Sequence, residues 1–373
     1  MDRITVHAPL SEYEVLIGEG LLGQMGALLR QRGLTGKVGI VTNPVVKGLY
    51  ARRVQEGLDR AGLNSVVFTV PDGEAYKTLD TVRGLYEQFL EAGLDRTSTL
   101  VALGGGVIGD TAGFAAATYM RGLPLVQVPT TLLAMVDASI GGKVGVDLPR
   151  GKNLVGAFKQ PALVVTDPTT LATLPHEEFR CGLAEVVKAG LIGSPALFAH
   201  LENRGAEPLA RVLREAIAVK VAIVEEDPFE GGRRAILNLG HTFGHALEAL
   251  SGYGLRHGYA VSIGMVVATR TAVRLGLCDP AVEARLKALL ERFALPMAYQ
   301  GFTPEKIWEA MASDKKKRGQ RLHFVLPLRI GEVVVTDQVP KEVVLQALTE
   351  RKGEREKIMT RHRRKTGGDQ TPP

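Results

Sequence analysis

Residues 99–110 read TLVALGGGVIGD, an apolar run that ends in three consecutive glycines. The apolar half is typical of a strand buried on both faces, and the residues after the glycines are predicted to begin a helix. Glycines between a strand and a helix let the backbone approach a ligand, and the helix N-terminus offers N–H groups to a pyrophosphate. The spacing differs from the usual dinucleotide fingerprint, so a plain tight turn is the alternative interpretation.

Similar apolar runs flank this segment, and helix-like stretches separate them. The runs are residues 38–42, 65–70, 125–129 and 162–166, with helical stretches to about 61 and from about 78 to 92. Continuous apolar strands that alternate with helices predict an α/β domain with a mostly parallel sheet covered on both faces.

The pattern changes after Asp167 and Pro168. Helical periodicity dominates the rest of the chain, and one hairpin is predicted over residues 322–336. The helices are expected at about 176–192, 206–225, 236–251, 258–275, 280–294 and 303–312. We therefore expect an α/β domain over residues 1–170 and a mostly α-helical domain over 171–350, with the boundary around 165–175.

Composition and charge narrow the class of protein. The 45% hydrophobic and 23% charged fractions are ordinary for a soluble globular protein, and no apolar run reaches the ~18 residues of a membrane span. Two cysteines and the absence of a signal-peptide pattern favour the cytoplasm. Residues 351–373 hold eight Lys/Arg and three Asp/Glu, so this tail supplies +5 of the net charge of +6. A disordered, solvated tail is favoured over a nucleic-acid-binding arm.

The stretch LNLGHTFGH at residues 237–245 suggests a metal site. His241 and His245 lie four residues apart, on one face of a predicted helix, and His257 follows shortly. Glu185 offers a carboxylate within an apolar helical segment. Imidazole and carboxylate are ligands of catalytic zinc. The spacing alone suggests His241 and His245 as joint ligands, and adding Glu185 and His257 does not fix the set. A thiolate ligand from Cys181 is conceivable, although a small core residue is the favoured interpretation.

Several cationic residues lie in glycine-rich or apolar contexts, where a solvated lysine is less expected, although each alone is more often a surface charge than a ligand. A polyanionic substrate would explain the cations together, since Lys and Arg bind phosphate and Arg can grip a carboxylate in a bidentate manner. The cationic set comprises Lys143, Lys152 beside Asn153, Lys188, Lys220, Arg234, and Lys315 and Lys316. A carboxylate of the 72–77 segment could accept hydrogen bonds from a ribose, although a solvated turn is favoured for that segment alone.

These motifs, in this order, resemble those of the 3-dehydroquinate synthase family. Its members are sugar-phosphate cyclases of the shikimate pathway. The similarity extends over roughly residues 10–348 and leaves out the basic tail. The matching segments are 72–77, 104–110, 115–122, 129–134, 137–145, 151–153, 184–188, 237–245 and 314–316. The resemblance implies an N-terminal NAD-binding α/β domain and a C-terminal, mostly helical domain that binds metal and substrate.

The resemblance also implies a role for each matching residue. Zinc or cobalt would be bound by Glu185, His241 and His257, which leaves His245 for the substrate phosphate or a bridging water. Substrate hydroxyls or the water near the metal would be held by Asp137 and Glu230, and Arg121 would reach the site of a second subunit in a homodimer. The substrate anions would meet Lys143, Lys152, Asn153, Lys188, Lys220, Arg234, Asn238 and a lysine of the 315–316 pair. The cofactor would contact Asn43, Asp72, Glu74, Lys77, Gly104, Gly105, Gly106, Asp110, Thr130, Thr131, Lys143, Lys152 and Thr173.

The implied reaction converts 3-deoxy-D-arabino-heptulosonate 7-phosphate to 3-dehydroquinate and phosphate. It would proceed by transient oxidation with NAD, phosphate elimination, reduction, ring opening and an intramolecular aldol step. The nearest alternative is another sugar-phosphate cyclase such as 2-deoxy-scyllo-inosose synthase, whose substrate, glucose 6-phosphate, has no carboxylate for Lys220 and Arg234. A metal-dependent polyol dehydrogenase is the second alternative. The third alternative is a protein that binds nucleic acid through its basic tail, and this alternative gives no role to the expected metal ligands.

Overall fold

The computed structural model describes residues 1–9, 11–317 and 322–349, and the side chains of 313–317 are not described. The tail expected at 351–373 and the side chains of Lys315 and Lys316 therefore lie outside the described residues. The chain divides into two compact units, Met1–Leu237 and Asn238–Pro373.

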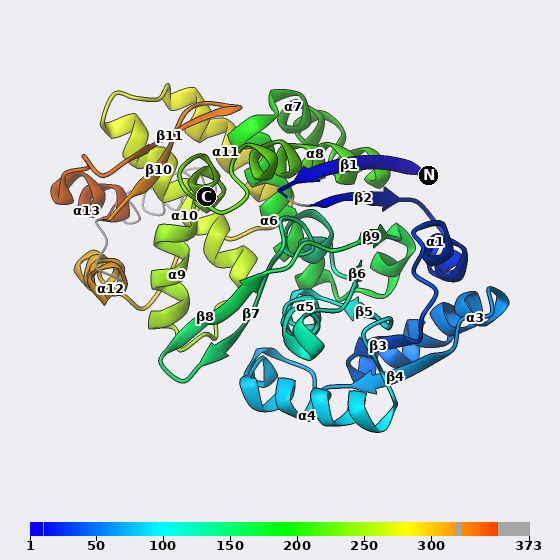
Figure 1. Ribbon diagram of the computed structural model, residues 1–373. Helices are drawn as coiled ribbons and strands as arrows, with labels where there is room; N and C mark the ends of the chain where they lie inside the picture. The colour runs from blue at the N-terminus through cyan, green and yellow to red at the C-terminus, as the bar shows by residue number, and fades with distance from the viewer. Residues whose placement is uncertain (10, 318–321, 350–373) are drawn as a thin grey trace, which may run out of the picture. The chain divides into compact units, whose positions relative to one another are not determined.

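The first unit is built on a sheet that is parallel except at one edge (Figure 1). Within the described residues, seven strands pair in the order β1-β2-β9-β6-β5-β3-β4. Only the β1–β2 pair is antiparallel among these neighbours. The strands are β1 (Asp2–Ala8), β2 (Ser11–Ile17), β3 (Val38–Thr42), β4 (Ser65–Thr69), β5 (Thr99–Gly104), β6 (Leu125–Pro129) and β9 (Leu163–Thr166).

Helices cover both faces of this sheet because its central strands are apolar on both sides. In β5, Leu100 and Ala102 belong to the core that also contains Phe89 of α4, whereas Val101 and Leu103 belong to the opposite core. Every residue of β5 is buried, which explains the continuous apolar run. The helices around the sheet are α1 (Met25–Gln31), α2 (Pro44–Val46), α3 (Arg52–Arg60), α4 (Leu79–Glu91) and α5 (Gly106–Thr118).

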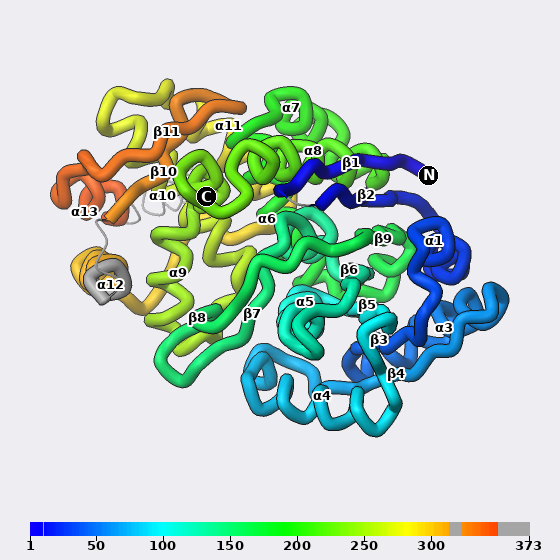
Figure 2. The backbone as a smooth tube through the Cα atoms, in the orientation of Figure 1, coloured from blue at the N-terminus to red at the C-terminus, as the bar shows by residue number. Residues whose placement is uncertain are grey.

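The rest of the first unit adds a hairpin and a group of helices. Strands β7 (Lys143–Leu148) and β8 (Gly151–Phe158) pair antiparallel, and Figure 2 shows them as a hairpin beside α5. The helices are α6 (His176–Gly193), α7 (Pro195–Arg204) and α8 (Leu209–Glu226). Helix α8 packs against β1 and β2, and α6 packs against α8.

The second unit is mostly helical. Its helices are α9 (His241–Leu250), α10 (His257–Arg274), α11 (Pro280–Arg292), α12 (Pro304–Lys317) and α13 (Lys341–Thr349). Strands β10 (Phe324–Arg329) and β11 (Glu332–Thr336) form the expected hairpin. Helices α9 and α10 approach closely, since a Cβ on Gly264 would lie 1.9 Å from the carbonyl oxygen of Gly240. Only glycine permits this approach.

Short helical turns complete the described chain. They are η1 (Leu21–Gln24), η2 (Lys47–Ala51), η3 (Glu74–Tyr76), η4 (Tyr119–Arg121), η5 (Ala134–Ala138), η6 (Pro168–Thr173) and η7 (Arg233–Asn238). Among the described residues, no helix combines the length and apolar character that crossing a membrane requires.

The fold expected from the sequence is confirmed, with differences at its margins. The apolar runs form β3, β4, β5, β6 and β9, but the hairpins β1–β2 and β7–β8 and helices α1, α7 and α13 were not predicted. The two compact units divide after Leu237, later than the expected boundary at 165–175. The packing of α6 and α8 explains this difference, because α6 packs against α7 and α8, and α8 packs against β1 and β2 of the sheet. The division into NAD-binding and metal- and substrate-binding domains stays a prediction.

Candidate metal and anion site

The residues expected to bind the nucleotide lie just beyond the carboxyl ends of adjacent parallel strands. Asn43 follows β3, Asp72 and Glu74 follow β4, and Thr130 and Thr131 follow β6. The Gly104–Gly106 turn joins β5 to the N-terminus of α5, and a Cβ on Gly104 would lie 2.7 Å from the Ile108 side chain. Parallel strands place all these positions along one edge of the sheet.

Local hydrogen bonds fix several of these side chains. Asn43 donates to Oδ1 of Asp72 at 2.6 Å and also caps α2 by accepting from the amide of Val46 at 2.8 Å. The amide of Thr130 donates to the carbonyl of Gly104 at 3.0 Å. The hydroxyl of Thr173 hydrogen-bonds to the hydroxyl of Tyr50.

Lys77 connects the nucleotide edge to the β7–β8 hairpin. Its buried ammonium donates to Oδ2 of Asp110 at 2.6 Å and to Oδ1 of Asn153 at 2.5 Å. Burial raises the pKa of Asp110 to about 6, although Lys77 opposes the shift. Burial lowers the pKa of Lys77, but Asp110 outweighs it and the net shift is upward. Both pKa values thus rise, and the pair is ionised at neutral pH.

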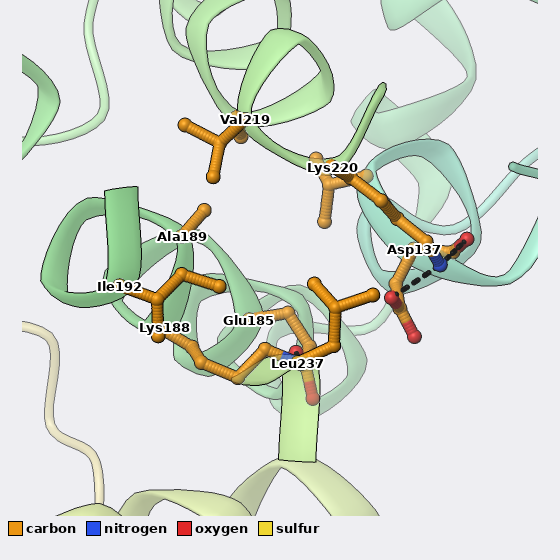
Figure 3. Close-up of a pocket in the computed structure, with 10 residues that line it drawn as sticks. Asp137, Glu185, Lys188, Ala189, Ile192, Val219, Lys220 and Leu237 are labelled. Carbon is orange, nitrogen blue, oxygen red and sulfur yellow. Dashed lines mark hydrogen bonds and ion pairs between the residues drawn. The ribbon is translucent and has the colours of Figure 1, made fainter. Parts of the chain in front are cut away.

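A small pocket of the first unit is lined by two ion pairs, in which only Asp137 is half-buried and the other three partners are buried (Figure 3). Lys220 of α8 donates to Oδ1 of Asp137 at 2.6 Å, and Lys188 pairs with Glu185 one turn earlier on α6. Apolar side chains complete the lining, namely Val136, Ala189, Ile192, Ala216, Val219 and Leu237. The pocket therefore presents charged groups on an otherwise apolar wall, where an anion would meet little competition from water.

The charges around this pocket influence one another strongly. Burial raises the pKa of Asp137, but Lys220 and Lys188 outweigh it and lower the pKa to about 2. Burial also lowers the pKa of Lys220, and Asp137 offsets this only in part. The pKa of both partners falls, because burial, Arg234 and Lys188 disfavour the Lys220 ammonium, whereas Lys220 and Lys188 favour the Asp137 carboxylate. The pKa of Lys188 lies above its ordinary value, because Glu185 and Asp137 outweigh the effect of burial.

Arg234 is held in place by main-chain oxygens. Its guanidinium donates to the carbonyls of Pro228 at 2.7 Å and Gly141 at 3.1 Å, and the side chain is only 2% exposed. The amide of Gly141 in turn donates to the hydroxyl of Tyr13 at 3.2 Å. Asp227 shapes the loop before Arg234 by accepting from the Arg234 amide at 2.9 Å.

The remaining expected residues of the first unit are more exposed. Lys143, at the start of β7, pairs with Glu230, and Lys152 lies 3.4 Å from Glu74. Arg121 is exposed and has a positive φ of 70°. Cys181 of α6 is buried, as expected for a small core residue.

Three histidines gather in the second unit. The ring centroids of His241 and His257 lie 5.1 Å apart, and His245 lies 5.3 Å from His241 and 6.2 Å from His257. Nδ1 of His241 lies 3.1 Å from the carbonyl oxygen of Leu239. His245 is exposed and Asn238 is half-buried. The expected helix over the first two histidines is confirmed as α9.

Two residues near these groups were missed in the sequence. Glu248 is buried and follows His241 by seven residues on α9, a helical spacing that could have drawn attention to it. Tyr13 lies in β2, far from Gly141 along the chain, and carries no sequence signal for that contact.

Family models match most of the described chain. Residues 67–181 match the model "3-dehydroquinate synthase N-terminal" and residues 182–317 match "3-dehydroquinate synthase C-terminal". A 3-dehydroquinate synthase of Crocosphaera subtropica is 44% identical over 358 residues, which cover 93% of this chain and 98% of the relative. The chain belongs to the 3-dehydroquinate synthase family. The family and the class of enzyme expected from the sequence are thereby confirmed.

Solved structures of related cyclases share the fold of this family member. A 2-epi-5-epi-valiolone synthase from Streptomyces hygroscopicus subsp. jinggangensis, with NAD⁺ and Zn²⁺ bound, has a TM-score of 0.84 and 31% identity, and the match covers 93% of this chain and 98% of that one. A 2-deoxy-scyllo-inosose synthase complexed with carbaglucose-6-phosphate, NAD⁺ and Co²⁺ has a TM-score of 0.84 and 26% identity, with 94% and 100% covered. The expected architecture of this 3-dehydroquinate synthase family member is thus confirmed.

Proposed function

We propose that the chain carries out the reaction for which its family is named, with NAD and one divalent metal ion. The substrate would be 3-deoxy-D-arabino-heptulosonate 7-phosphate and the products 3-dehydroquinate and phosphate. The observation that carries this proposal is the pocket lined by the ion pairs Lys188–Glu185 and Lys220–Asp137, whose two lysines are buried. Buried lysines are costly unless they have anionic partners, and Glu185 and Asp137 fill that need here. The pairs keep two ammonium groups charged on an apolar wall, where they could stabilise a substrate anion.

The metal would be bound by Glu185, His241 and His257. One carboxylate and two imidazoles are a known donor set of catalytic zinc that leaves a position for substrate. Glu185 is buried and ion-paired, and both histidines are half-buried, so the donor types fit the group. When bound, the ion would lower the pKa of a coordinated substrate hydroxyl. The proposal requires these three side chains to bind the same ion, which is zinc or cobalt.

NAD would bind at the carboxyl edge of the sheet between β3 and β5. The chain leaves β3 toward α3 on one face and leaves β5 toward α5 on the other, which makes this a topological switch point. The N-terminus of α5 would receive the pyrophosphate, and the carboxylates after β4 would accept hydrogen bonds from ribose hydroxyls. When bound, the cofactor would accept a hydride from the substrate and return it later in the same turnover.

The chain's own residues would bind, orient and shield the substrate. Lys188 and Lys220 would stabilise negative charge, and the ionised Asp137 carboxylate would accept a hydrogen bond from a substrate hydroxyl. Lys143, Lys152, Asn153, Asn238, His245 and the 315–316 lysines would contact the anionic groups or the phosphate, and Glu230 would hold a hydroxyl. We assign no general base, because an oxygen of the substrate phosphate can take the proton that leaves carbon.

Arg234 favours the heptulosonate phosphate over glucose 6-phosphate, the substrate of 2-deoxy-scyllo-inosose synthase. A buried guanidinium with a fixed orientation is suited to a carboxylate, which the heptulosonate has and glucose 6-phosphate lacks. Arg234 therefore favours the dehydroquinate reaction over inosose formation.

We also propose a cytoplasmic homodimer in which Arg121 reaches the partner's site. The exposure of Arg121 and its left-handed backbone conformation support a side chain presented outward from the turn after α5. Sedimentation of the purified protein would measure the oligomeric state.

The decisive experiment is incubation of the purified, full-length protein with the heptulosonate phosphate, NAD and Zn²⁺ or Co²⁺. We expect equal amounts of inorganic phosphate and dehydroquinate, without accumulation of NADH. Glucose 6-phosphate is the matched control and should give no phosphate release. Glu185→Ala and His257→Ala should lose both the metal and turnover, and full activity with normal metal content would contradict the ligand assignment. Net NADH formation would instead indicate a polyol dehydrogenase.

A further inference from the structure

The surroundings of His241 determine which of its two ring nitrogens carries the proton. Nδ1 lies 3.1 Å from the carbonyl oxygen of Leu239, which can only accept a hydrogen bond. Nδ1 of His241 therefore carries the proton, and the lone pair of the neutral ring resides on Nε2. Nε2 is consequently the nitrogen that His241 offers to a metal.

A buried carboxylate faces the corresponding nitrogen of His257. Nδ1 of His257 lies 3.5 Å from Oε2 of Glu248, and Glu248 is 5% exposed. Glu248 lies on α9 with His241, whereas His257 is the first residue of α10. The packing of α9 against α10 therefore sets this approach.

We propose that Glu248 is a positioning residue that orients His257 toward the metal. A carboxylate that accepts a hydrogen bond from Nδ1–H fixes the ring, selects the tautomer with its lone pair on Nε2 and makes that nitrogen a stronger ligand. His241 and His257 would then offer the same type of nitrogen, one held by a main-chain carbonyl and the other by Glu248. This inference rests on the metal site proposed above and adds a residue to it.

The competing interpretation makes Glu248 a ligand itself. His245, Glu248 and His257 form a candidate group whose donor atoms lie within 4.8 Å of one another. In that arrangement a negative charge at position 248 is needed, whereas an orienting role needs only an oxygen that accepts a hydrogen bond. Glutamine retains such an oxygen and lacks the charge, so the amide variant separates the two roles.

The test measures Zn²⁺ affinity of the full chain by competition with a chelating dye, together with the visible spectrum of the Co²⁺-loaded protein. We expect Glu248→Ala to weaken Zn²⁺ binding by roughly 10- to 100-fold and to alter the Co²⁺ spectrum. Glu248→Gln should remain within a few-fold of the wild type and keep its spectrum. His245→Gln should retain the metal, and Glu291→Ala, which removes an exposed carboxylate of α11, is the matched control.

Three outcomes would overturn the inference. Unchanged Zn²⁺ affinity in Glu248→Ala would remove Glu248 from any role at the metal. Equal loss of metal in Glu248→Gln and Glu248→Ala, or loss in His245→Gln, would make Glu248 a ligand. A wild-type protein that binds no Zn²⁺ or Co²⁺ would instead reject the proposed metal site as a whole. Thermal unfolding of each metal-free variant checks that the alanine substitution leaves the fold intact.

Discussion

The ammonium of Lys77 lies 2.6 Å from Oδ2 of Asp110, and the same ammonium donates to Asn153 on the β7–β8 hairpin. Asp110 belongs to α5, whose N-terminus follows the glycine turn, so one lysine links that helix to the hairpin. Lys77 is buried and Asp110 is half-buried, so the removal of one partner alone leaves a poorly solvated charge on the other and destabilises the fold.

The first prediction concerns the pH dependence of stability. The folded-state pKa of Asp110 is about 6, above the ordinary value of 3.8, so the folded state holds the proton more tightly than the unfolded state. The resulting stabilisation is fully present below about pH 4 and is lost as the pH rises through about 6, a change of roughly 3 kcal/mol. Urea unfolding between pH 4 and 7 should show the wild type losing this amount relative to Asp110→Asn. Parallel profiles would contradict the assignment.

The second prediction concerns the pair between buried Lys220 and half-buried Asp137. Lys220→Met should destabilise the protein by about 1–3 kcal/mol, because the half-buried Asp137 carboxylate loses its charged partner. The double variant Lys220→Met/Asp137→Asn should recover most of this stability while remaining inactive. Arg211→Met, which removes an exposed guanidinium that pairs with half-buried Glu215 on the same helix, should cost about 1 kcal/mol. Urea unfolding and phosphate release measure the two effects, and recovery of activity in the double variant would exclude Lys220 from catalysis.

The third prediction concerns Arg234. A lysine at this position cannot reach both main-chain carbonyls with a planar fork, so Arg234→Lys should lower kcat/KM for the heptulosonate phosphate by about 100-fold. The neighbouring Arg233 is exposed and lies 3.3 Å from Glu226, so Arg233→Lys is the matched control and should change kcat/KM less than about two-fold. Equal effects of the two substitutions on kcat/KM would show that Arg234 does not bind the substrate.

The fourth prediction concerns the contact between α9 and α10. A methyl group in Gly264→Ala would press on the carbonyl of Gly240, and the helices would have to separate at a cost of about 1–3 kcal/mol. Because His241 directly follows Gly240, metal affinity should fall as well. Gly84→Ala on α4 has open space around it and should stabilise by about 0.5–1 kcal/mol. Denaturant unfolding of both variants checks the opposite signs.

The parallel sheet could be predicted because burial on both faces leaves a continuous apolar signal. The β7–β8 hairpin left no such signal, since Gly145 and Gly156 interrupt it and their close approach across the strands depends on pairing. The β1–β2 hairpin lies at the sheet edge and is partly exposed, which weakens its apolar pattern in the same way.

Less of the candidate site than of the fold could be predicted from the sequence. The spacing of His241 and His245 predicted a shared helix face, which is confirmed, but spacing could not choose among three neighbouring histidines. The pairs Lys220–Asp137 and Lys77–Asp110 join residues 83 and 33 positions apart, respectively. Such partners are chosen by tertiary packing, which a periodic pattern does not encode.

The hydroxyl of Tyr13 has a practical consequence for anyone who shortens this protein. It accepts the hydrogen bond of the Gly141 amide, and the carbonyl of Gly141 in turn holds Arg234. The match to the family model begins only at residue 67, so a fragment cut there would keep every charged group assigned to the substrate. Such a fragment would lack β1, β2 and β3 and begin inside β4, so it would lose strands of the sheet as well as the tyrosine that supports Arg234. Its inactivity would be misread if the leading segment were regarded as dispensable.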